Sequence, residues 1–519
     1  MHGRHAERAV PSLGLLVLLV WLVTAAGAFF QDSIGINIPG ETLAPELYTV
    51  LRDGGFTFAR KDLTWDKVEK VKGVYNFTEF DGLVKALLPS TRLYFIIDYG
   101  NPLYTKDGDA PITSEAIAAY CRFFIGAVSH FKGKGFIFEV WNEPNWVFWK
   151  PLPNASQYLR LVGALSHAFA SRPDLADEII VGPALAAPPL GGLGLDWKFL
   201  KRVLTNRDAV CLFDYISVHL YTQYEPETRI DDYREINTLI SSGWAAAGGN
   251  CSRKGKAKPG IISGEWGWST CKILGKPGPC VFEAQTGTNN NVDQAKFLSR
   301  MYLMNGMSKV DVSIYFDFIE GTGHYGIVDV NGSSPNMTIR TKPGYQAART
   351  LNTVLTNFTF VARRPSKILE GRVCSAYSAN KTDCGHFGIS QSACEKRGCC
   401  FDVPHVSGPQ CYTLSKEQGN ESVYVLEFER EESVPSIFPA TSSPVFSVWI
   451  NGTGKAAKKA KDNWTLKPNV QVNFPVRAAG MCFHQLDYLG GETVPRVCSD
   501  GEGTLTVNVT DKPAFLVGL

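Results

Sequence analysis

The stretch Gly135-Phe136-Ile137-Phe138-Glu139-Val140-Trp141-Asn142-Glu143-Pro144 carries the most information about this chain. It begins as a mostly apolar, β-prone run, as in a buried strand, and ends in an amide, a carboxylate and a proline. Burying an unpaired carboxylate costs several kcal/mol, so packing does not explain Glu143. In a (β/α)8 barrel that end of a strand opens into the active site. The alternative is a carboxylate that caps a following helix.

A second short apolar strand also ends in an acid, in Gly260-Ile261-Ile262-Ser263-Gly264-Glu265-Trp266-Gly267-Trp268. Two carboxylates at the mouths of two barrel strands suit retaining glycoside hydrolysis, in which an acid/base and a nucleophile face each other about 5 Å apart. The flanking indoles suit a sugar site, because the apolar face of a pyranose stacks on an aromatic ring. A structural role for Glu265 is the alternative.

The region 29–357 alternates short β-like runs with longer helical patterns, clearest in Ser114–Phe131, Gln157–Ser171 and Val292–Met304. Eight such units favour an α/β fold, a closed (β/α)8 TIM barrel, over an open sheet. A doubly wound sheet would also want a phosphate-binding G-x-G-x-x-G loop after an early strand, and none is present. The expected strands are Ser33–Ile38, Phe56–Leu63, Arg92–Asp98, Gly135–Pro144, Glu178–Ala184, Tyr215–Tyr221, Gly260–Gly267 and Val312–Phe318.

From Phe358 onward the pattern changes to strands and turns without helices, which predicts a β-sandwich. Six cysteines interrupt it: Cys374, Cys384, Cys394, Cys399, Cys400 and Cys411. Their density and the adjacent pair favour a disulfide-rich module over a zinc site. Because the strand Phe358–Arg363 precedes the cysteines and its expected partners follow them, we expect the module to be an insertion into the sandwich. The other expected strands are Val423–Glu429, Val445–Ile450, Asn469–Val476, Met481–Leu489 and Gly503–Val509.

The bulk composition is that of a folded protein with more than one domain. The 519 residues are 44% hydrophobic and 20% charged, with a formal net charge of +2. So small a charge does not favour nucleic acid or an anionic membrane as partner. A basic run from Lys455 to Lys461 is interpreted as a solvated hairpin tip.

The N-terminus has the pattern of a secretory signal peptide. Arg4 and Arg8 precede the apolar run Leu13–Val23, and small residues allow cleavage after Ala28. We expect no transmembrane or lipid anchor, and a secreted or extracellular protein; a lysosomal or vacuolar destination is also compatible. Glycosylation sequons begin at Asn76, Asn154, Asn250, Asn331, Asn336, Asn357, Asn380, Asn420, Asn451, Asn463 and Asn508.

Among the 13 cysteines, two pairs outside the cluster are expected to be bonded. Cys271 and Cys280 share a Gly/Pro-rich loop, and Cys482 and Cys498 flank a sandwich hairpin. No partner is assigned to the remaining three, Cys121, Cys211 and Cys251.

Several barrel motifs resemble clan A glycoside hydrolases, with family 39 as the nearest match. They are Arg60-Lys61-Asp62-Leu63-Thr64-Trp65, the segment from Phe138 to Trp149, and Phe213-Asp214-Tyr215-Ile216-Ser217-Val218-His219-Leu220-Tyr221. The resemblance covers the whole barrel and places Glu143 on the acid/base strand and Glu265 on the nucleophile strand. The chain departs from the pattern at Gly264, where a hydroxyl residue is common.

The cysteine cluster, with its C-x9-C-x9-C-x4-C-C-x10-C spacing and Arg397-Gly398-Cys399-Cys400-Phe401-Asp402, closely resembles a trefoil (P-type) domain. This resemblance implies the bridges Cys374–Cys400, Cys384–Cys399 and Cys394–Cys411. Trefoil domains elsewhere accompany glycosidases and mucin-associated proteins.

The expected site thus has Glu143 as acid/base and Glu265 as nucleophile, without cofactor or metal. Asn142 is placed to hydrogen-bond a sugar 2-hydroxyl, and Arg60 and Tyr221 to hold Glu265 ionised. His219 and Trp266 complete the substrate-binding set, although a core role for His219 is equally compatible. Trp65, Trp146, Trp268 and the segment Asp98–Asn101 are further candidates for lining the site.

The predicted domains are a signal peptide (1–28), a catalytic barrel (29–357), a sandwich (358–372 and 413–519) and a trefoil module (373–412). The predicted function is a secreted retaining glycoside hydrolase that cleaves β-linked glycosides or a polysaccharide. Two other classes compete: an inactive extracellular glycan-binding protein, and a structural mucin-associated protein. The presence of both glutamates favours the enzyme.

Overall fold

The computed structural model describes residues 33–39, 43–106, 108–187, 196–222, 225–249, 251, 257–271, 290–321, 323–356, 358–370, 382–385, 389–397, 399–401, 411–413, 423–430, 444–450 and 470–518. The predicted signal peptide and the basic run 455–461 lie outside these residues. No described helix is long and apolar enough to cross a membrane.

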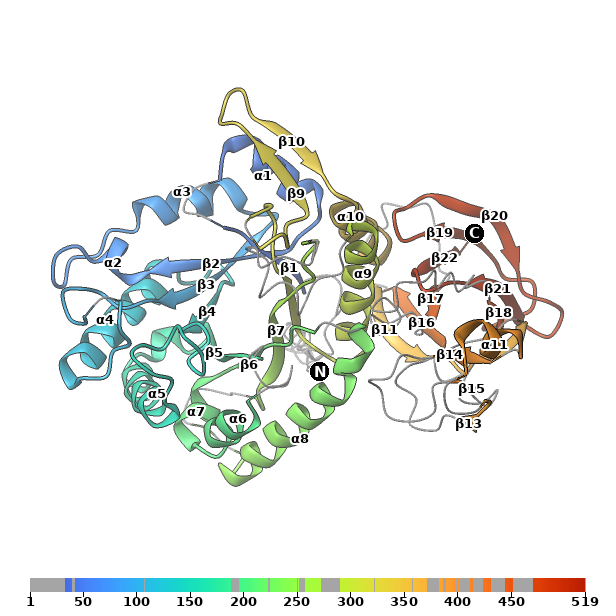
Figure 1. Cartoon of the computed structure of the whole chain (residues 1–519). Helices are drawn as coiled ribbons and strands as arrows, with labels where there is room; N and C mark the ends of the chain where they lie inside the picture. The colour runs from blue at the N-terminus through green and yellow to red at the C-terminus, as the bar shows by residue number, and fades with distance from the viewer. Residues whose placement is uncertain are drawn as a thin grey trace, which may run out of the picture.

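Eight parallel strands close into a barrel in sequence order, and the last strand pairs with the first (Figure 1). The predicted TIM barrel and each of its eight predicted strands are confirmed. The strands are β1 (Ile34–Asn37), β2 (Phe58–Thr64), β3 (Arg92–Asp98), β4 (Ile137–Val140), β5 (Ile179–Ala186), β6 (Tyr215–His219), β7 (Gly260–Trp266) and β8 (Val312–Tyr315).

Helices surround the barrel, and several begin at a side-chain cap. Asn154 accepts hydrogen bonds from the backbone N–H groups of Ser156 and Gln157, and Thr113 accepts one from Ala116, which satisfies donors that a helix leaves free. The helices are α1 (Pro45–Asp53), α2 (Trp65–Val68), α3 (Thr78–Leu87), α4 (Ser114–His130), α5 (Ala155–Ala170), η1 (Pro173–Leu175), α6 (Trp197–Leu204), α7 (Arg207–Leu212), η2 (Pro226–Arg229), α8 (Ile230–Ala246), α9 (Asn291–Met307) and α10 (Pro343–Leu355). A hairpin of β9 (Val328–Asn331) and β10 (Thr338–Thr341) precedes α10.

The barrel interior is apolar at the N-terminal ends of the strands and polar toward their C-terminal ends. One buried cluster contains Phe58, Tyr94, Ile137, Val181, Ile262, Val312 and Ile314. Arg60 and Glu139 lie two residues further along β2 and β4, and both are fully buried. Since successive side chains alternate between the faces of a strand, these charges point into the barrel above the apolar layer.

The C-terminal domain contains two antiparallel sheets, which confirms the predicted sandwich. One has the order β11-β16-β17-β22-β19-β20 and the other β12-β18-β21. The strands are β11 (Phe358–Arg363), β12 (Lys367–Glu370), β16 (Val423–Arg430), β17 (Val445–Ile450), β18 (Val470–Pro475), β19 (Cys482–Asp487), β20 (Glu492–Cys498), β21 (Thr504–Val509) and β22 (Ala514–Gly518). Three of them, β12, β20 and β22, were not predicted.

The chain enters the sandwich before the cysteine cluster and returns to it afterwards. β11 pairs with β16, and β12 pairs with β18, so each of the two sheets contains a strand from either side of the cluster. The trefoil module is therefore inserted in the sandwich, as predicted. The domain boundaries at individual residues remain a prediction.

The barrel and the sandwich share one core, and a buried ion pair of the barrel accepts a hydrogen bond from the sandwich. Tyr424, Leu426 and Phe515 belong to the same apolar cluster as the barrel helices. Arg300 on α9 bonds Glu227 through Nε at 2.8 Å, and the indole of Trp449 on β17 donates to that carboxylate at 2.7 Å. Because Trp449 belongs to the sandwich, its hydrogen bond to the buried Glu227 carboxylate helps to fix the sandwich against the barrel.

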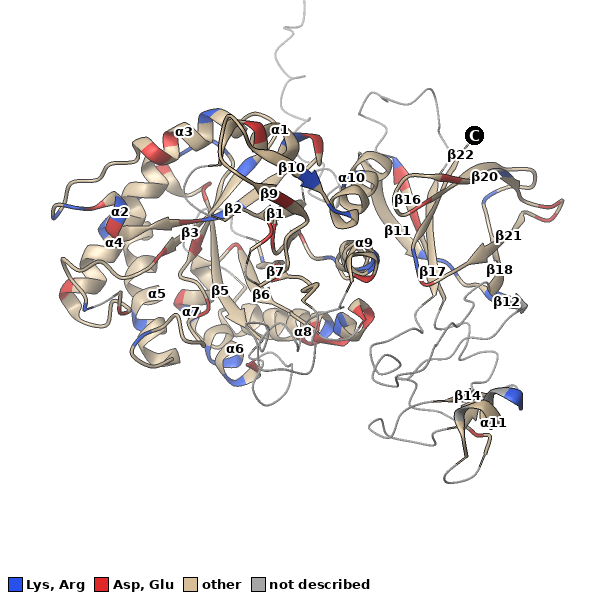
Figure 2. Ribbon diagram, turned by 45° about the horizontal axis from the view of Figure 1, so that its top comes forward, with Lys and Arg blue, Asp and Glu red and all other residues tan. Residues whose placement is uncertain are grey.

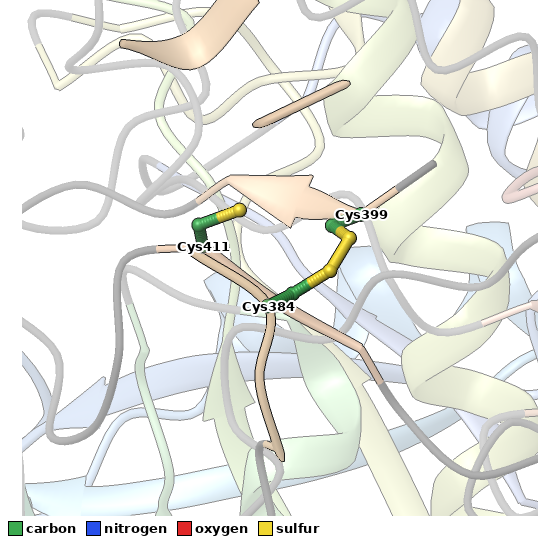
Figure 3. A group of neighbouring side chains, drawn as sticks. All are labelled: Cys384, Cys399 and Cys411. Carbon is green, nitrogen blue, oxygen red and sulfur yellow. A yellow bond between two sulfur atoms is a disulfide. The ribbon is translucent and has the colours of Figure 1, made fainter. Parts of the chain in front are cut away.

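The trefoil region contains β13 (Thr382–Asp383), α11 (Gln391–Lys396), β14 (Cys400–Phe401) and β15 (Cys411–Thr413), with the sheet order β13-β15-β14. In Figure 2, α11 and β14 lie apart from the sandwich strands. The disulfides Cys384–Cys399, drawn in Figure 3, and Cys394–Cys411 are present, as the resemblance implied. The third implied bridge, Cys374–Cys400, falls outside the described residues.

Outside the trefoil, the predicted Cys482–Cys498 disulfide is confirmed. Cys271 is disulfide-bonded, but its predicted partner Cys280 lies outside the described residues. Cys211 and Cys251, to which no partner was assigned, bond each other, and Cys121 is a buried free thiol. Of the sequon asparagines, those described are all exposed, namely Asn76, Asn154, Asn331, Asn336 and Asn508.

Candidate active site

The backbone at the end of β4 is strained where it presents Glu143. Trp141 and Glu143 have φ values of 67° and 44°, in the left-handed region that residues with a Cβ seldom adopt. The Glu143 N–H donates to the carbonyl of Ala184 at 3.1 Å, and the buried Trp141 indole donates to the carbonyl of Phe148 at 3.1 Å. Strain held in place by such contacts is typical of functional sites.

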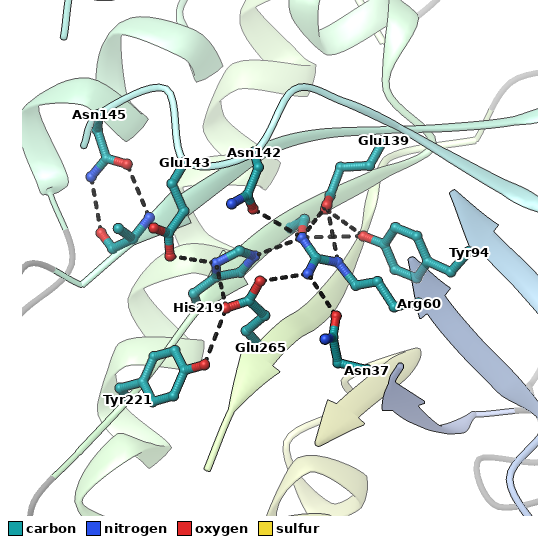
Figure 4. Close-up of polar contacts among 12 residues, drawn as sticks. Asn37, Arg60, Tyr94, Glu139, Asn142, Glu143, Asn145, His219, Tyr221 and Glu265 are labelled. Carbon is teal, nitrogen blue, oxygen red and sulfur yellow. Dashed lines mark hydrogen bonds and ion pairs between the residues drawn. The ribbon is translucent and has the colours of Figure 1, made fainter. Parts of the chain in front are cut away.

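Glu143, His219 and Glu265 converge from β4, β6 and β7 (Figure 4). His219 Nδ1 lies 2.7 Å from Glu143 Oε1 and 3.6 Å from Glu265 Oε2. One oxygen of Glu143 and one of Glu265 lie within 4.8 Å of each other, in agreement with the predicted spacing of about 5 Å. Glu143 and His219 are buried, His219 fully, and the side chain of Glu265 is 12% exposed.

Arg60 from β2 joins Glu265 to a second buried acid. Its Nη1 donates to Glu265 Oε1 at 2.5 Å, and its Nε and Nη2 donate to Glu139 Oε1 at 3.1 and 2.5 Å. The Tyr221 hydroxyl donates to Glu265 Oε2 at 3.1 Å. Arg60 and Tyr221 thus both contact Glu265, and their role in keeping it ionised stays a prediction. Charge-assisted bonds of this kind are among the strongest in proteins and fix the carboxylate in place.

The surroundings shift the pKa values of the two carboxyls in opposite directions. Burial and the charge of Glu265 raise the pKa of Glu143 above its usual range, although His219 opposes them. Burial also raises the pKa of Glu265, but His219, Arg60 and Tyr221 together outweigh it and leave that pKa lowered. Between the two pKa values Glu143 carries a proton and Glu265 does not, as an acid and a nucleophile require.

His219 is fixed between the carboxyls partly because residue 264 lacks a side chain. A Cβ on Gly264 would lie 2.5 Å from Ser217 Oγ and 3.1 Å from His219 Nε2. Burial lowers the pKa of His219, whereas the charges of Glu265 and Glu143 raise it, and the net shift is upward. The departure from the family pattern at Gly264 therefore makes room for the imidazole.

Asn142 is oriented on both sides of its amide. Its Oδ1 accepts from Arg60 Nη2 at 3.1 Å, and its Nδ2 donates to the Tyr99 hydroxyl at 3.2 Å. Within the candidate segment Asp98–Asn101, Tyr99 is the part that reaches the site. Asn101 is buried and donates to the carbonyl of Glu69 at 2.8 Å, which ties the loop after β3 to the loop after β2.

The tryptophans next to the acids are core residues, with one exception. The predicted substrate contact of Trp266 is wrong, because its side chain is fully buried and its indole donates to Ser313 Oγ at 3.0 Å. Trp65 and Trp268 are also buried, whereas Trp146, in the loop after Glu143, is partly exposed. Alternation along β7 explains the error, since Glu265 and Trp266 must point to opposite faces.

Three further residues of the site escaped the sequence analysis. Glu139 is fully buried beneath Arg60, and Tyr94 donates to its Oε2 at 2.5 Å. Asp317 follows β8, and burial, with the charge of Glu265 adding to it, raises the pKa of Asp317 to about 8. Glu139 is the one charged residue in an otherwise apolar strand, and a buried charge needs a partner. This pattern could have indicated that Glu139 pairs with Arg60.

Among the residues that the structure describes, two groups of side chains have the spacing of metal ligands. In Glu143, His219 and Glu265 the ligand atoms lie within 4.8 Å of one another, but Arg60 already places a positive charge against Glu265. A metal cation there would face that charge. In the group Cys384, Cys399 and Cys411, the first two form a disulfide with each other (Figure 3) and Cys411 is bonded to Cys394, so none offers a thiolate to a metal.

Comparison with known proteins agrees with both parts of this architecture. Residues 374–413 match the family model of the trefoil (P-type) domain. A Beta-xylosidase of Geobacillus stearothermophilus is 27% identical over 183 residues, 32% of this chain and 34% of that protein. The match thus spans about a third of the relative's length.

Solved glycoside hydrolase structures share the fold. A family 39 glycoside hydrolase from Bacteroides cellulosilyticus superposes with a TM-score of 0.60 at 17% identity, covering 95% of this chain and 82% of that one. A beta-xylosidase from Caulobacter crescentus gives 0.51 at 13%, covering 94% and 95%. An alpha-L-arabinofuranosidase from Thermotoga maritima gives 0.52 at 10%, covering 94% and 97%. The chain thus shares the fold of these glycoside hydrolases, and its residues 374–413 match the trefoil (P-type) domain.

Proposed function

We propose that this protein is a retaining glycoside hydrolase in which Glu143 is the acid/base and Glu265 the nucleophile. One observation carries the proposal: the two carboxyls face each other with one oxygen of each within 4.8 Å, and their pKa values are shifted in opposite directions. Retaining enzymes place their carboxyls about 5 Å apart, whereas inverting enzymes need a wider gap for water.

In the first step Glu265 attacks the anomeric carbon while the glycosidic C–O bond breaks. Glu143 gives its proton to the departing oxygen, and a glycosyl ester of Glu265 forms. His219 Nδ1 faces Oε1 of Glu143, so the proton of the acid is carried on Oε2. Arg60 and Tyr221 keep the attacking carboxylate ionised until the bond forms.

In the second step the roles reverse. Glu143, now ionised, takes a proton from a water molecule, and the water oxygen bonds to the anomeric carbon as the ester bond to Glu265 breaks. Glu143 regains its proton and Glu265 its charge, so the site returns to its starting state. Asn142 is held by Arg60 and Tyr99 in a position to bond the sugar 2-hydroxyl, an interaction that strengthens in the transition state.

For the substrate we propose a β-linked glycoside, with a β-xyloside as the first candidate because the curated relative is a Beta-xylosidase. The test is a panel of 4-nitrophenyl β-D-xyloside, β-D-glucoside, β-D-glucuronide and α-L-arabinofuranoside. Proton NMR of the first product formed reports the anomer released. Turnover with retention is expected. Absence of turnover in wild type would favour a glycan-binding protein, and an inverted first product would exclude Glu265 as nucleophile.

We further propose that the protein is secreted after cleavage behind Ala28 and is glycosylated. The disulfides and the trefoil domain support an oxidising compartment. Expression in a eukaryotic secretory host, with N-terminal sequencing of protein from the medium, tests the proposal. A mature chain that still carries residues 1–28 would contradict it.

A further inference from the structure

The loop that follows Glu143 carries an unusual amount of exposed apolar surface. Among the described residues, Val147, Phe148 and Leu152 are large hydrophobic side chains with 59%, 36% and 74% of their surface exposed. The described part of the chain has only four others of this kind, Val71, Val74, Val292 and Val361. Three such residues within one six-residue stretch mark a surface that is kept apolar beside the acid.

This loop is held firmly in place. The side chain of Asn145 makes two hydrogen bonds to the backbone of Ala186 on β5: its Nδ2 donates to the carbonyl and its Oδ1 accepts from the N–H, both at 2.9 Å. The carbonyl of Lys150 accepts from Ala110 of the neighbouring loop at 3.1 Å. Trp149 is fully buried against Trp141, with ring centroids 5.4 Å apart. The backbone and the buried tryptophans thus fix the exposed side chains on a rigid support.

Phe148 is linked to the sugar-binding side of the site. Its ring stacks on Tyr99 with centroids 5.8 Å apart and planes at 19°, and the Tyr99 hydroxyl accepts from Asn142. Figure 4 shows Glu143 lying between Asn145, where this loop begins, and the Arg60–Glu265 pair. Phe148 therefore connects the exposed loop to the residue that we assign to the 2-hydroxyl.

We propose that the loop Trp146–Leu152 is the binding surface for the leaving group, and that it takes the apolar face of an aromatic ring or of a second pyranose. This inference rests on the proposed function. Because Glu143 must reach the glycosidic oxygen, the leaving group lies on the Glu143 side of the pair, where this loop begins. Its exposed Phe148 offers the flat apolar surface on which such a ring stacks.

The test compares two substrates that share a sugar but not a leaving group. Phe148→Ala is assayed on the 4-nitrophenyl glycoside and on the glycosyl fluoride of the sugar that turns over fastest in the panel above. The kcat/KM for the aryl glycoside should fall about tenfold, the scale of one aromatic contact, and that for the fluoride should change less than about twofold. Phe148→Tyr, which keeps the ring, should restore the aryl activity.

Val147→Ser serves as a second variant, since it leaves the Phe148–Tyr99 stack in place, and Val361→Ala on β11 is the matched control at an exposed valine. Val147→Ser should show the same selective loss for the aryl glycoside, and Val361→Ala none. The inference would be overturned if the loop variants lost kcat/KM equally on both substrates. It would also be overturned if neither Phe148→Ala nor Val147→Ser lost activity on the aryl glycoside. Either result would leave the proposed function intact. A wild-type protein that turns over neither substrate would overturn the proposed function, and this inference with it.

Discussion

His219 Nδ1 lies 2.7 Å from Glu143 Oε1, so the proposed acid is in direct contact with a group that lowers its pKa. His219 lowers the pKa of Glu143 through a hydrogen bond and its charge, and its charge also lowers that of Glu265. The imidazole thus acts on both carboxyls at once. Its role is one of positioning and electrostatics, because its side chain is fully buried.

The pH dependence of kcat/KM should be bell-shaped. Activity falls on the acid side when Glu265 is protonated, at a pKa below its usual 4.5, and on the alkaline side when Glu143 loses its proton, at a pKa above 4.5. In His219→Asn the lowering influence of His219 is lost, so both limbs should move to higher pH. A profile of kcat/KM for an aryl glycoside measures this shift. If His219→Asn lowered the activity but left both limbs of the pH profile at their wild-type positions, the role of His219 would be purely structural.

Azide rescue should separate the roles of the two glutamates. Glu265→Ala should lose nearly all turnover, and azide should enter from the face left open, giving the glycosyl azide of inverted configuration. Glu143→Ala should lose about 10²- to 10⁴-fold, the scale of general acid catalysis, with the retained azide as product. NMR of the azide products measures the outcome. The opposite pattern would mean that the two roles are exchanged.

Gly264→Ala should displace His219. The new Cβ would lie 2.5 Å from Ser217 Oγ and 3.1 Å from His219 Nε2, so the imidazole would have to shift. A shift of about 1 Å in a group that positions a catalytic residue can lower kcat by roughly ten- to a hundred-fold. Adding Ser217→Ala removes the nearer atom and should recover part of the loss. Gly82→Ala is the control, since a Cβ there meets nothing within 4 Å. Wild-type kcat in the single variant would show that His219 tolerates the shift.

The Cys211–Cys251 disulfide should stabilise the barrel between α7 and the segment before β7. It closes a loop of 40 residues, and removing such a bridge costs about 2–4 kcal/mol. Cys211→Ser/Cys251→Ser should therefore unfold at lower temperature in calorimetry while retaining activity at 25 °C. Cys121→Ser, at the free thiol, controls for the loss of a buried sulfur. Alkylation of Cys211 without reduction would show that the bond is absent.

The trefoil module should be separable from the rest of the protein. β11 and β12, which precede the cysteine cluster in sequence, pair with β16 and β18, which follow it. The module also has its own disulfides. Replacing 373–412 with a short Gly/Ser linker should leave the melting temperature and the turnover of an aryl glycoside close to wild type. Unfolding of the whole protein would show that the module is a structural bridge and would contradict the domain map.

The sequence by itself determined the barrel, the sandwich and the positions of the two glutamates. Each of these follows from a local pattern: an apolar run of strand length marks β4 and β7, and parallel strands bring their C-terminal ends to one face. A carboxyl at the end of each run therefore had to lie at that face. The cysteine spacing identified the trefoil in the same local way.

Only the tertiary structure decided what surrounds the two carboxyls. Arg60, Glu139 and Tyr94 meet inside the barrel from three different strands, and no short-range pattern pairs them. Because Glu265 turns into the barrel, Trp266 is buried on the opposite face of β7. The approach of α7 to the segment before β7 joined Cys211 to Cys251. Contacts between residues far apart in sequence depend on strand register and closure, which the chain acquires only when all eight strands are assembled.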